Sequence, residues 1–176
     1  MRHLRLLGIL LVVAVAGYTA GARGGPASGS RSHEPGATKP SAGRVLRVVD
    51  GDTIQVQVGG RPEKVRYIGV DTPESVKPGT PVQCYAKRAS AYNEHLIAGK
   101  RVRLVYDAER RDRYGRLLAY VYRRSDGLFV NAALVRGGYA HALRIPPDVA
   151  HAEEFRRLAA DARRAGRGLW TACPAS

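Results

Sequence analysis

The chain contains few of the residues that hold zinc or build a membrane architecture. Only two of its 176 residues are cysteine and five are histidine, and the histidines show no ligand spacing, so the sequence offers no zinc site. Apolar residues make up 44% and charged residues 25%, which excludes collagen, wholesale disorder and a multi-span membrane protein. There is no internal repeat. The length corresponds to one globular domain.

Negative charge is also scarce. The chain has 15 acidic and 29 basic residues, which leaves a formal net charge of +14. Arginine dominates the basic residues, and its planar guanidinium suits phosphate. The excess therefore indicates nucleic acid or an anionic membrane surface as a partner, unless the arginine reflects only the codon usage of the genome. Composition suggests a class of partner but no reaction.

The first 43 residues lack the features of a folded domain. A short basic region, an apolar run over residues 6–16 and the small residues 20–22 predict that residues 1–22 are a secretory signal peptide. An uncleaved membrane anchor is the alternative. Residues 23–43 contain no Val, Leu, Ile or aromatic residue and are predicted to be a flexible linker. We therefore expect a secreted or cell-envelope protein whose domain, residues 44–176, keeps a net charge of +10.

Export changes how the two cysteines are interpreted. Cys84 and Cys173 form an even pair in a chain directed to an oxidising compartment. Such pairs are usually oxidised, so the sequence predicts a disulfide between them.

Alternating and β-branched segments predict a domain of strands followed by helices. Five strands are expected over residues 45–49, 53–58, 64–70, 101–106 and 117–123. Helical spacing of apolar residues predicts helices over residues 82–98, 130–136 and 152–165. This order favours an α+β fold, a five-stranded β-barrel of the oligonucleotide-binding type (OB-fold) with about three helices. An open α+β sheet would have the same periodicity.

Two charged segments of this basic domain could carry chemistry. The acids Asp50, Asp52, Asp71 and Glu74 lie within 25 residues at predicted strand ends. Carboxylates and carbonyl oxygens are the ligands that calcium and magnesium prefer, although each segment alone is also an ordinary turn sequence. The second segment, residues 112–116, places basic and aromatic groups in a tight turn that alone would be a solvated loop.

The order and spacing of these segments resemble the staphylococcal nuclease-like (thermonuclease) family, from about residue 44 to residue 170. The segments that carry the resemblance are Val-Asp-Gly-Asp-Thr at 49–53, Arg-Tyr-Ile-Gly-Val-Asp-Thr-Pro-Glu at 66–74, Asp-Arg-Tyr-Gly-Arg at 112–116, Leu-Ala-Tyr at 118–120, Val-Asn at 130–131 and Ala-Leu-Val-Arg-Gly-Gly at 133–138. The resemblance implies an OB-fold barrel with added helices. It also implies a calcium-dependent phosphodiesterase that cleaves DNA and RNA and leaves 3′-phosphate ends.

The resemblance further implies a role for each matching residue. Asp52, Asp71 and the main-chain carbonyl of Thr72 would bind Ca²⁺, with Asp50 close to them. A site with two carboxylates is weak, which is acceptable where calcium is abundant outside the cell.

Catalysis by this resemblance would use one acid and two arginines. Glu74 would accept a proton from the attacking water or orient that water, while Arg66 and Arg116 would neutralise charge on the phosphate. Arg113 and Tyr114 would contact a terminal phosphate of the substrate.

Two segments depart from the family pattern. Residues 139–147 lack the tyrosine-rich stretch that stacks a base in the staphylococcal enzyme, so base preference stays open, and residues 76–81 differ next to Glu74. We expect a monomer that needs no protein partner, acts on single-stranded or frayed nucleic acid, and meets a membrane only if its N-terminal segment is retained.

A nucleic-acid-binding OB-fold module without catalysis is the alternative function. The acids argue against it, because carboxylates repel phosphate unless a cation lies between them.

Overall fold

The computed structural model describes residues 39–75, 79 and 81–173. The predicted signal peptide and most of the predicted linker lie outside the described residues. Across the described ranges, no helix is long and apolar enough to cross a membrane.

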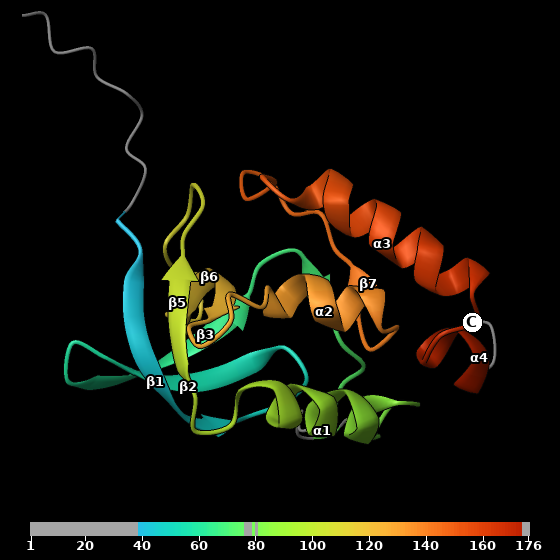
Figure 1. Cartoon of the computed structure of the whole chain (residues 1–176), viewed down its shortest axis with the longest axis horizontal. Coiled ribbons are helices and arrows are strands. Elements are labelled where there is room, and N and C mark those ends of the chain that lie inside the picture. Colours follow the sequence, from blue (N-terminus) through green and yellow to red (C-terminus); the bar gives the residue numbers. More distant parts are fainter. Residues whose placement is uncertain (1–38, 76–78, 80, 174–176) are drawn as a thin grey trace, which may run out of the picture. The chain divides into compact units, whose positions relative to one another are not determined.

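The centre of the domain is a closed five-stranded barrel, which confirms the predicted barrel and shows that the open sheet is wrong (Figure 1). Its strands, in the order in which they pair, are β1 (Ser41–Val48), β2 (Thr53–Val58), β3 (Arg61–Tyr67), β6 (Leu117–Arg123) and β5 (Arg101–Val105). The pair that joins β3 to β6 is parallel, and the other pairs are antiparallel. The barrel therefore closes between segments about 50 residues apart in the sequence.

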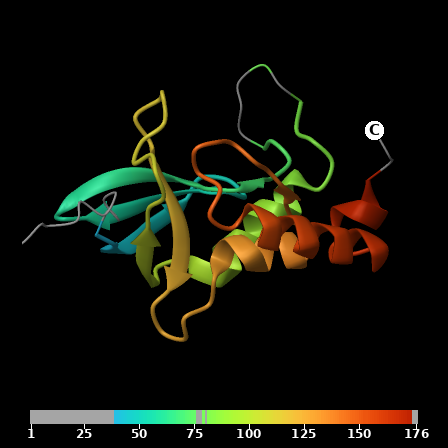
Figure 2. The same ribbon diagram turned by 90° about the horizontal axis from the view of Figure 1, so that it is seen from above.

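Helices cover one end of the barrel (Figure 2). They are α1 (Ala86–Ile97), α2 (Val130–Arg136), α3 (Ala152–Arg164) and the short α4 (Leu169–Ala172). Helix α2 contacts both β6 and α3 and so links the barrel to the C-terminal helices. The three longer helices were predicted, whereas α4 was not.

The core follows from the alternation of residues along each strand. Apolar side chains that point into the barrel are fully buried; they include Val45, Ile54, Val56, Val65, Val102, Leu104, Leu117 and Val121. Asn131 of α2 is polar and is also fully buried. Its amide accepts a hydrogen bond from the Val121 main-chain N–H at 2.9 Å and donates one to the Ile68 carbonyl at 2.9 Å. These bonds attach α2 to the barrel. They also give the buried Val121 N–H and Ile68 carbonyl a hydrogen-bond partner.

The first strand begins inside the predicted linker, which corrects its boundary at residue 43. Strand β1 starts at Ser41, and Gly43 pairs with both Val58 and Val102. A Cβ at position 43 would lie 2.6 Å from the Gln57 carbonyl oxygen. The glycine serves close strand packing here rather than flexibility.

Two predicted elements have clearly different bounds in the structure. The strand predicted over residues 64–70 begins earlier, at Arg61, and ends at Tyr67, and the chain resumes as β4 (Val70–Asp71), which pairs with β7 (His141–Ala142). The break lies at Gly69, whose φ of 77° is accessible to glycine. The helix predicted over residues 82–98 begins only at Ala86, because Tyr85 has a left-handed backbone with φ 70°.

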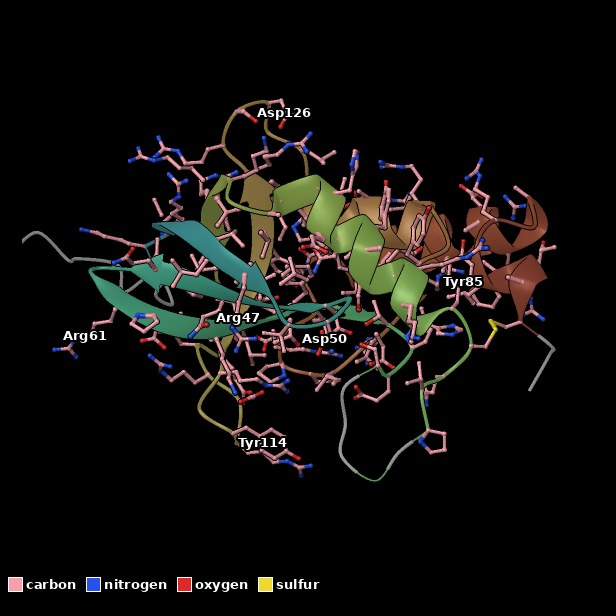
Figure 3. All side chains as sticks on the ribbon, turned by 90° about the horizontal axis from the view of Figure 1, so that it is seen from below. Arg47, Asp50, Arg61, Tyr85, Tyr114 and Asp126 are labelled. Atoms are coloured by element: carbon pink, nitrogen blue, oxygen red, sulfur yellow. A yellow bond between two sulfur atoms is a disulfide. The ribbon has the colours of Figure 1, made fainter. Side chains whose placement is uncertain are left out.

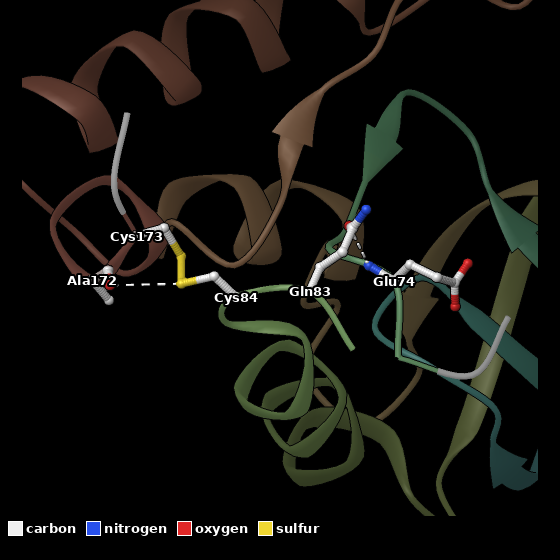
Figure 4. The surroundings of a disulfide bond; sticks show 5 residues. All are labelled: Glu74, Gln83, Cys84, Ala172 and Cys173. Atoms are coloured by element: carbon white, nitrogen blue, oxygen red, sulfur yellow. Dashed lines mark hydrogen bonds between the residues drawn. A yellow bond between two sulfur atoms is a disulfide. The ribbon is translucent and has the colours of Figure 1, made fainter. Parts of the chain in front are cut away.

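The predicted disulfide is confirmed between Cys84 and Cys173 (Figure 4). The Cα atoms are 5.8 Å apart, and the residues are separated by 89 positions in the sequence. The bond connects the segment before α1 to the residue that follows α4. It therefore joins the start of one covering helix to the C-terminal end of the described chain.

We predict that replacing both cysteines by serine lowers the free energy of unfolding by about 4 to 5 kcal/mol, because a long loop is no longer closed in the unfolded chain. Urea unfolding measures this difference. A reductant should reproduce the loss in the parent protein and have no effect on the double variant. Two titratable thiols in the denatured, unreduced protein would contradict the disulfide.

Candidate functional site

Asp52 is a buried carboxylate in the turn that connects β1 to β2. Its side chain is 2% exposed, and its main-chain N–H donates to Asp50 Oδ1 at 3.0 Å, which shapes the turn. Gly51 lies between them against Thr72, where a Cβ would come within 2.6 Å of Thr72 Oγ1. The Asp-Gly-Asp sequence thus lets this turn pack directly on the segment after β4.

The Asp52 carboxylate has donors on both oxygens. Oδ2 accepts hydrogen bonds from the Thr72 main-chain N–H and from Thr72 Oγ1, each at 2.8 Å. Oδ1 accepts from the Arg66 guanidinium and, at 3.2 Å, from Thr53 Oγ1. A buried carboxylate needs such compensation, because an unpaired charge is costly to remove from water.

Arg66 of β3 bridges the two predicted calcium ligands. Besides Asp52, its guanidinium donates to Asp71 Oδ1 at 2.9 Å and to the Val70 carbonyl at 3.2 Å. Asp71 belongs to β4, and its side chain is 55% exposed. The structure therefore brings Asp52, Arg66 and Asp71 together as a pair of carboxylates around one cation, open to solvent on the Asp71 side.

Asp50 lies at the edge of this cluster, and the charge of Glu74 affects the pKa of its carboxyl. Burial raises the pKa of the Asp50 carboxyl above its ordinary value, the hydrogen bond from Thr53 and the Arg66 charge oppose that rise, and the Glu74 charge adds to it. The charge of Glu74 therefore contributes to the electrostatics of the Asp50 carboxyl.

A buried asparagine holds the Asp50 turn in place, and the sequence interpretation missed it. Asn93 of α1 is fully buried; its Nδ2 donates to the Asp50 carbonyl at 3.0 Å, and its Oδ1 accepts from the Tyr67 hydroxyl at 2.9 Å. A signal was present, because Asn93 lies four residues from both Ala89 and Ile97 on the buried face of the helix. A polar residue on the buried face of a helix needs a hydrogen-bond partner inside the protein.

Glu74 is held by the segment that carries the disulfide. The Glu74 main-chain N–H donates to Gln83 Oε1 at 2.7 Å, and the Gln83 N–H donates to the Glu74 carbonyl at 3.0 Å (Figure 4). Gln83 directly precedes Cys84, which is bonded to Cys173. The main chain of Glu74 is therefore connected to α4 through one glutamine and one covalent bond.

Arg116 is positioned by Asp112 in the turn before β6. Asp112 Oδ1 accepts from the main-chain N–H groups of Tyr114 and Arg116 at 2.9 Å each, and Oδ2 accepts from Arg116 Nε at 2.7 Å. Within the described ranges, Arg116 Nη1 and Nη2 take part in no hydrogen bond. These two nitrogens are available to an anion, while Nε fixes the orientation of the guanidinium.

Arg113 and Tyr114 form the exposed tip of the same turn. Arg113 Nη2 donates to the Tyr114 hydroxyl at 2.7 Å, and both Arg113 and Arg116 lie over the Tyr114 ring, at 4.8 and 5.4 Å from its centroid. The Tyr114 side chain is 68% exposed (Figure 3). The tip therefore offers an aromatic surface beside two guanidinium groups.

Strand pairing brings the two groups of residues onto one face. Arg66 pairs with Leu118, and Arg116 is two residues before Leu118, so both arginines point to the same side of the β3–β6 pair. The rise along a strand separates their rows by about 7 Å. The predicted site residues thus converge from the β1–β2 turn, β3, β4 and the turn before β6.

The oxygen-rich cluster fits a hard cation. Asp52 and Asp71 both bond one positive group, the Arg66 guanidinium, so the two carboxylates lie close enough to share a cation. Among the described residues there is no group of three or more His, Cys, Asp or Glu arranged to hold a metal. Two carboxylates with a main-chain carbonyl remain a suitable donor set for calcium.

The chain is similar to known nucleases. A family model described as "Staphylococcal nuclease homologue" matches residues 64–172. The thermonuclease of Staphylococcus intermedius is 44% identical over 126 residues, which cover 72% of this chain and 74% of that protein. The thermonuclease of Staphylococcus hyicus is 41% identical over 128 residues, which cover 73% and 75%. Endonuclease YncB of Bacillus subtilis is 39% identical over 127 residues, 71% of this chain and 59% of that protein.

These matches confirm the resemblance found in the sequence. The family match extends over the strands and turns that carry Arg66, Asp71, Glu74 and Arg116, and it ends at α4. This chain belongs to the family of staphylococcal nuclease homologues.

Proposed function

We propose that this chain is a secreted, calcium-dependent nuclease that hydrolyses phosphodiester bonds in DNA and RNA and leaves 3′-phosphate ends. Membership of a nuclease family supports the nuclease activity. One observation supports metal-dependent chemistry on a phosphodiester: a buried and an exposed carboxylate share one guanidinium on the face that also holds Arg116. Acids and arginines gathered in this way match a phosphodiester and its metal ion.

The metal ion would be held by Asp52, Asp71 and the Thr72 carbonyl, with Asp50 beside them. A bound calcium ion supplies a Lewis acid that polarises a phosphoryl oxygen. Thr72 orients the Asp52 carboxylate through two hydrogen bonds, and the exposure of Asp71 leaves the cluster open to substrate. The oxygen ligands are thus already in position before the metal ion or the substrate binds.

The arginines neutralise charge that develops on the phosphate. Asp112 holds Arg116 through Nε, so its two terminal nitrogens can bond the phosphate oxygens. Arg66 donates to Asp52 and Asp71, and a cation bound by these carboxylates would replace that interaction. The Arg66 fork would face the same phosphate as Arg116, so two positive groups would neutralise the oxyanion.

Glu74 accepts the proton of the water that attacks phosphorus, or orients that water. The bond between phosphorus and the 5′ oxygen breaks, the 5′ oxygen takes up a proton from solvent to become a hydroxyl, and the phosphate stays on the 3′ side. Gln83 fixes the main chain of Glu74 at two points, so this carboxylate starts from a defined position. Arg113 and Tyr114 contact a further phosphate of the substrate from the exposed tip of their turn.

Secretion accords with the metal and the disulfide. A site with two carboxylates is weak, but extracellular calcium reaches the millimolar range in which sites with dissociation constants of ~10⁻⁴ to 10⁻³ M are filled. A disulfide that joins α1 to α4 also belongs to an oxidising compartment. We expect a monomer that prefers single-stranded or frayed substrates, because OB-fold grooves follow an unpaired strand.

We predict that chelation abolishes cleavage of plasmid and single-stranded DNA and that added calcium restores it. Asp71→Asn should raise the calcium concentration needed for half-maximal turnover, because one carboxylate ligand is lost. Asp161→Asn, which removes an exposed carboxylate of α3, is the matched control and should leave that concentration unchanged. Full activity in excess chelator would exclude the metal.

We predict that Arg66→Lys and Arg116→Lys each lower turnover by ~10² to 10³, because lysine keeps the charge but loses the fork geometry. Glu74→Gln should have a similar effect, since it removes the base without adding bulk. Substrate affinity in calcium should change little, because many phosphate contacts contribute to it.

For each variant, turnover is measured at saturating substrate, and substrate binding is measured separately. Arg156→Lys, at an exposed position of α3, is the control. If the lysine variants keep their turnover and lose only affinity, the arginines bind the substrate and do not stabilise the transition state. That result would favour the non-catalytic binding module.

We predict that Gln83→Ala lowers turnover about tenfold or more without weakening substrate binding. The reason is that the Glu74 main-chain N–H loses its hydrogen bond to the Gln83 side chain. The double variant Gln83→Ala/Glu74→Gln should be no slower than Glu74→Gln alone, since both changes act on one group. Gln55→Ala removes a comparable exposed hydrogen bond, to Arg47, and serves as the control. Additive losses in the double variant would show that Gln83 acts elsewhere.

A further inference from the structure

Three arginines line a cavity on the outside of the barrel, away from the carboxylate cluster. The cavity has a volume of about 270 Å³, and its polar lining consists of Arg44, Arg101, Arg124 and Gln57. Strand register brings these residues together: Arg44 of β1 is directly opposite both Arg101 of β5 and Gln57 of β2, and the Arg124 main-chain N–H donates to the Arg101 carbonyl at 2.9 Å. We call this feature the arginine cavity.

The guanidinium groups of the arginine cavity have no anionic partner. All three side chains are exposed, and none has a hydrogen bond or ion pair to another described residue. Like charges directly opposite each other on neighbouring strands destabilise a sheet. Arg123, which directly precedes Arg124, is by contrast paired with Asp126 at 2.9 and 2.6 Å. The cavity therefore concentrates positive charge that the protein itself does not neutralise.

Strand direction places the arginine cavity at the other end of β2 from the carboxylate cluster. Thr53, at the start of β2, is opposite Arg66, whereas Gln57, four residues later, is opposite Arg44. Four residues of a strand span about 13 Å. One phosphate cannot reach both places, so the arginine cavity is a separate site.

We propose that the arginine cavity binds a backbone phosphate of the nucleic acid, several nucleotides from the bond that is cleaved. This inference rests on the proposed nuclease function and adds a second point of attachment for the same strand. Guanidinium forks match phosphate oxygens, and the neutral Gln57 amide adds a donor without charge. Such contacts depend on the backbone and not on the base.

The lining favours a nucleic acid over a membrane. Apart from the four polar residues, the cavity is lined by Ala42 and Gly43, so no large apolar side chain is present to enter a lipid layer. A concave site with several forks suits a single phosphate better than a flat array of headgroups. Free inorganic phosphate has the same chemistry and is distinguished by experiment.

The test uses the full chain with Glu74→Gln, so that binding is measured without cleavage. Arg44, Arg101 and Arg124 are all changed to glutamine, and fluorescence anisotropy follows single-stranded oligonucleotides of about 4 and about 16 nucleotides. The dissociation constant of the longer strand should rise about tenfold or more, while that of the shorter strand stays within about twofold. The salt dependence should also fall, by about 0.7 in log–log slope for each phosphate that the variant no longer neutralises.

A matched variant separates the site from net charge. Lys87, Arg136 and Arg157 are exposed on three helices, and changing all three to glutamine removes the same charge. This control should bind both oligonucleotides nearly as the parent does. Equal losses in both triple variants, or no loss in the arginine-cavity variant, would overturn the proposal. Unchanged thermal unfolding midpoints verify that each variant is folded.

Two further probes identify the occupant. Inorganic phosphate alone is titrated by calorimetry, and vesicles containing phosphatidylglycerol are tested by sedimentation. If the arginine-cavity variant loses phosphate or vesicle binding but keeps its affinity for the longer strand, the occupant is not nucleic acid and the proposal is wrong. A parent protein that binds long strands through this cavity but cleaves nothing would refute the proposed nuclease alone.

Discussion

The burial of one carboxylate constrains the whole candidate site. Asp52 is almost fully removed from solvent and can remain charged only because Thr72 and Arg66 donate to it. Those two residues fix the β1–β2 turn against both β3 and the segment after β4. Arg66 in turn orients Asp71, which is exposed. A single desolvated charge thus sets the relative position of three chain segments and leaves one acid facing water.

The barrel and most of the candidate site could be predicted from local patterns. Strand β2, strand β6 and helix α2 have the predicted bounds, because alternation and helical spacing are strong there and glycines or turns end the elements. The site was recognisable because its residues lie in short segments with fixed spacing. Asp52, Arg66 and Asp71 interact through side chains that such segments bring together. Local sequence therefore contained enough information for this part of the molecule.

What could not be predicted depends on contacts between distant segments. The left-handed backbone at Tyr85 begins α1 late, next to the segment that Glu74 and Cys173 hold in place. The short β4–β7 pair lies beside Gly69, against which Phe155 of α3 packs. The linker boundary was wrong because Gly43 has a packing role that composition cannot distinguish from flexibility. Asn93 and Gln83 were missed because each bonds a main-chain group outside its own helical or strand pattern: Asn93 bonds Asp50, 43 positions away, and Gln83 bonds Glu74, nine positions away across the loop.

The parallel pairing of β3 with β6 determines the order in which the site can be assembled. Asp52, Arg66 and Asp71 lie within 20 residues of one another and can approach as soon as the first three strands form. Arg116 joins them only after α1 and β5 have been made and β6 has closed the barrel. Long-range closure is the slow part of folding such a topology. Until the β3–β6 pair has formed, the acidic residues therefore have no second arginine held beside them, and the complete site belongs to the closed barrel alone.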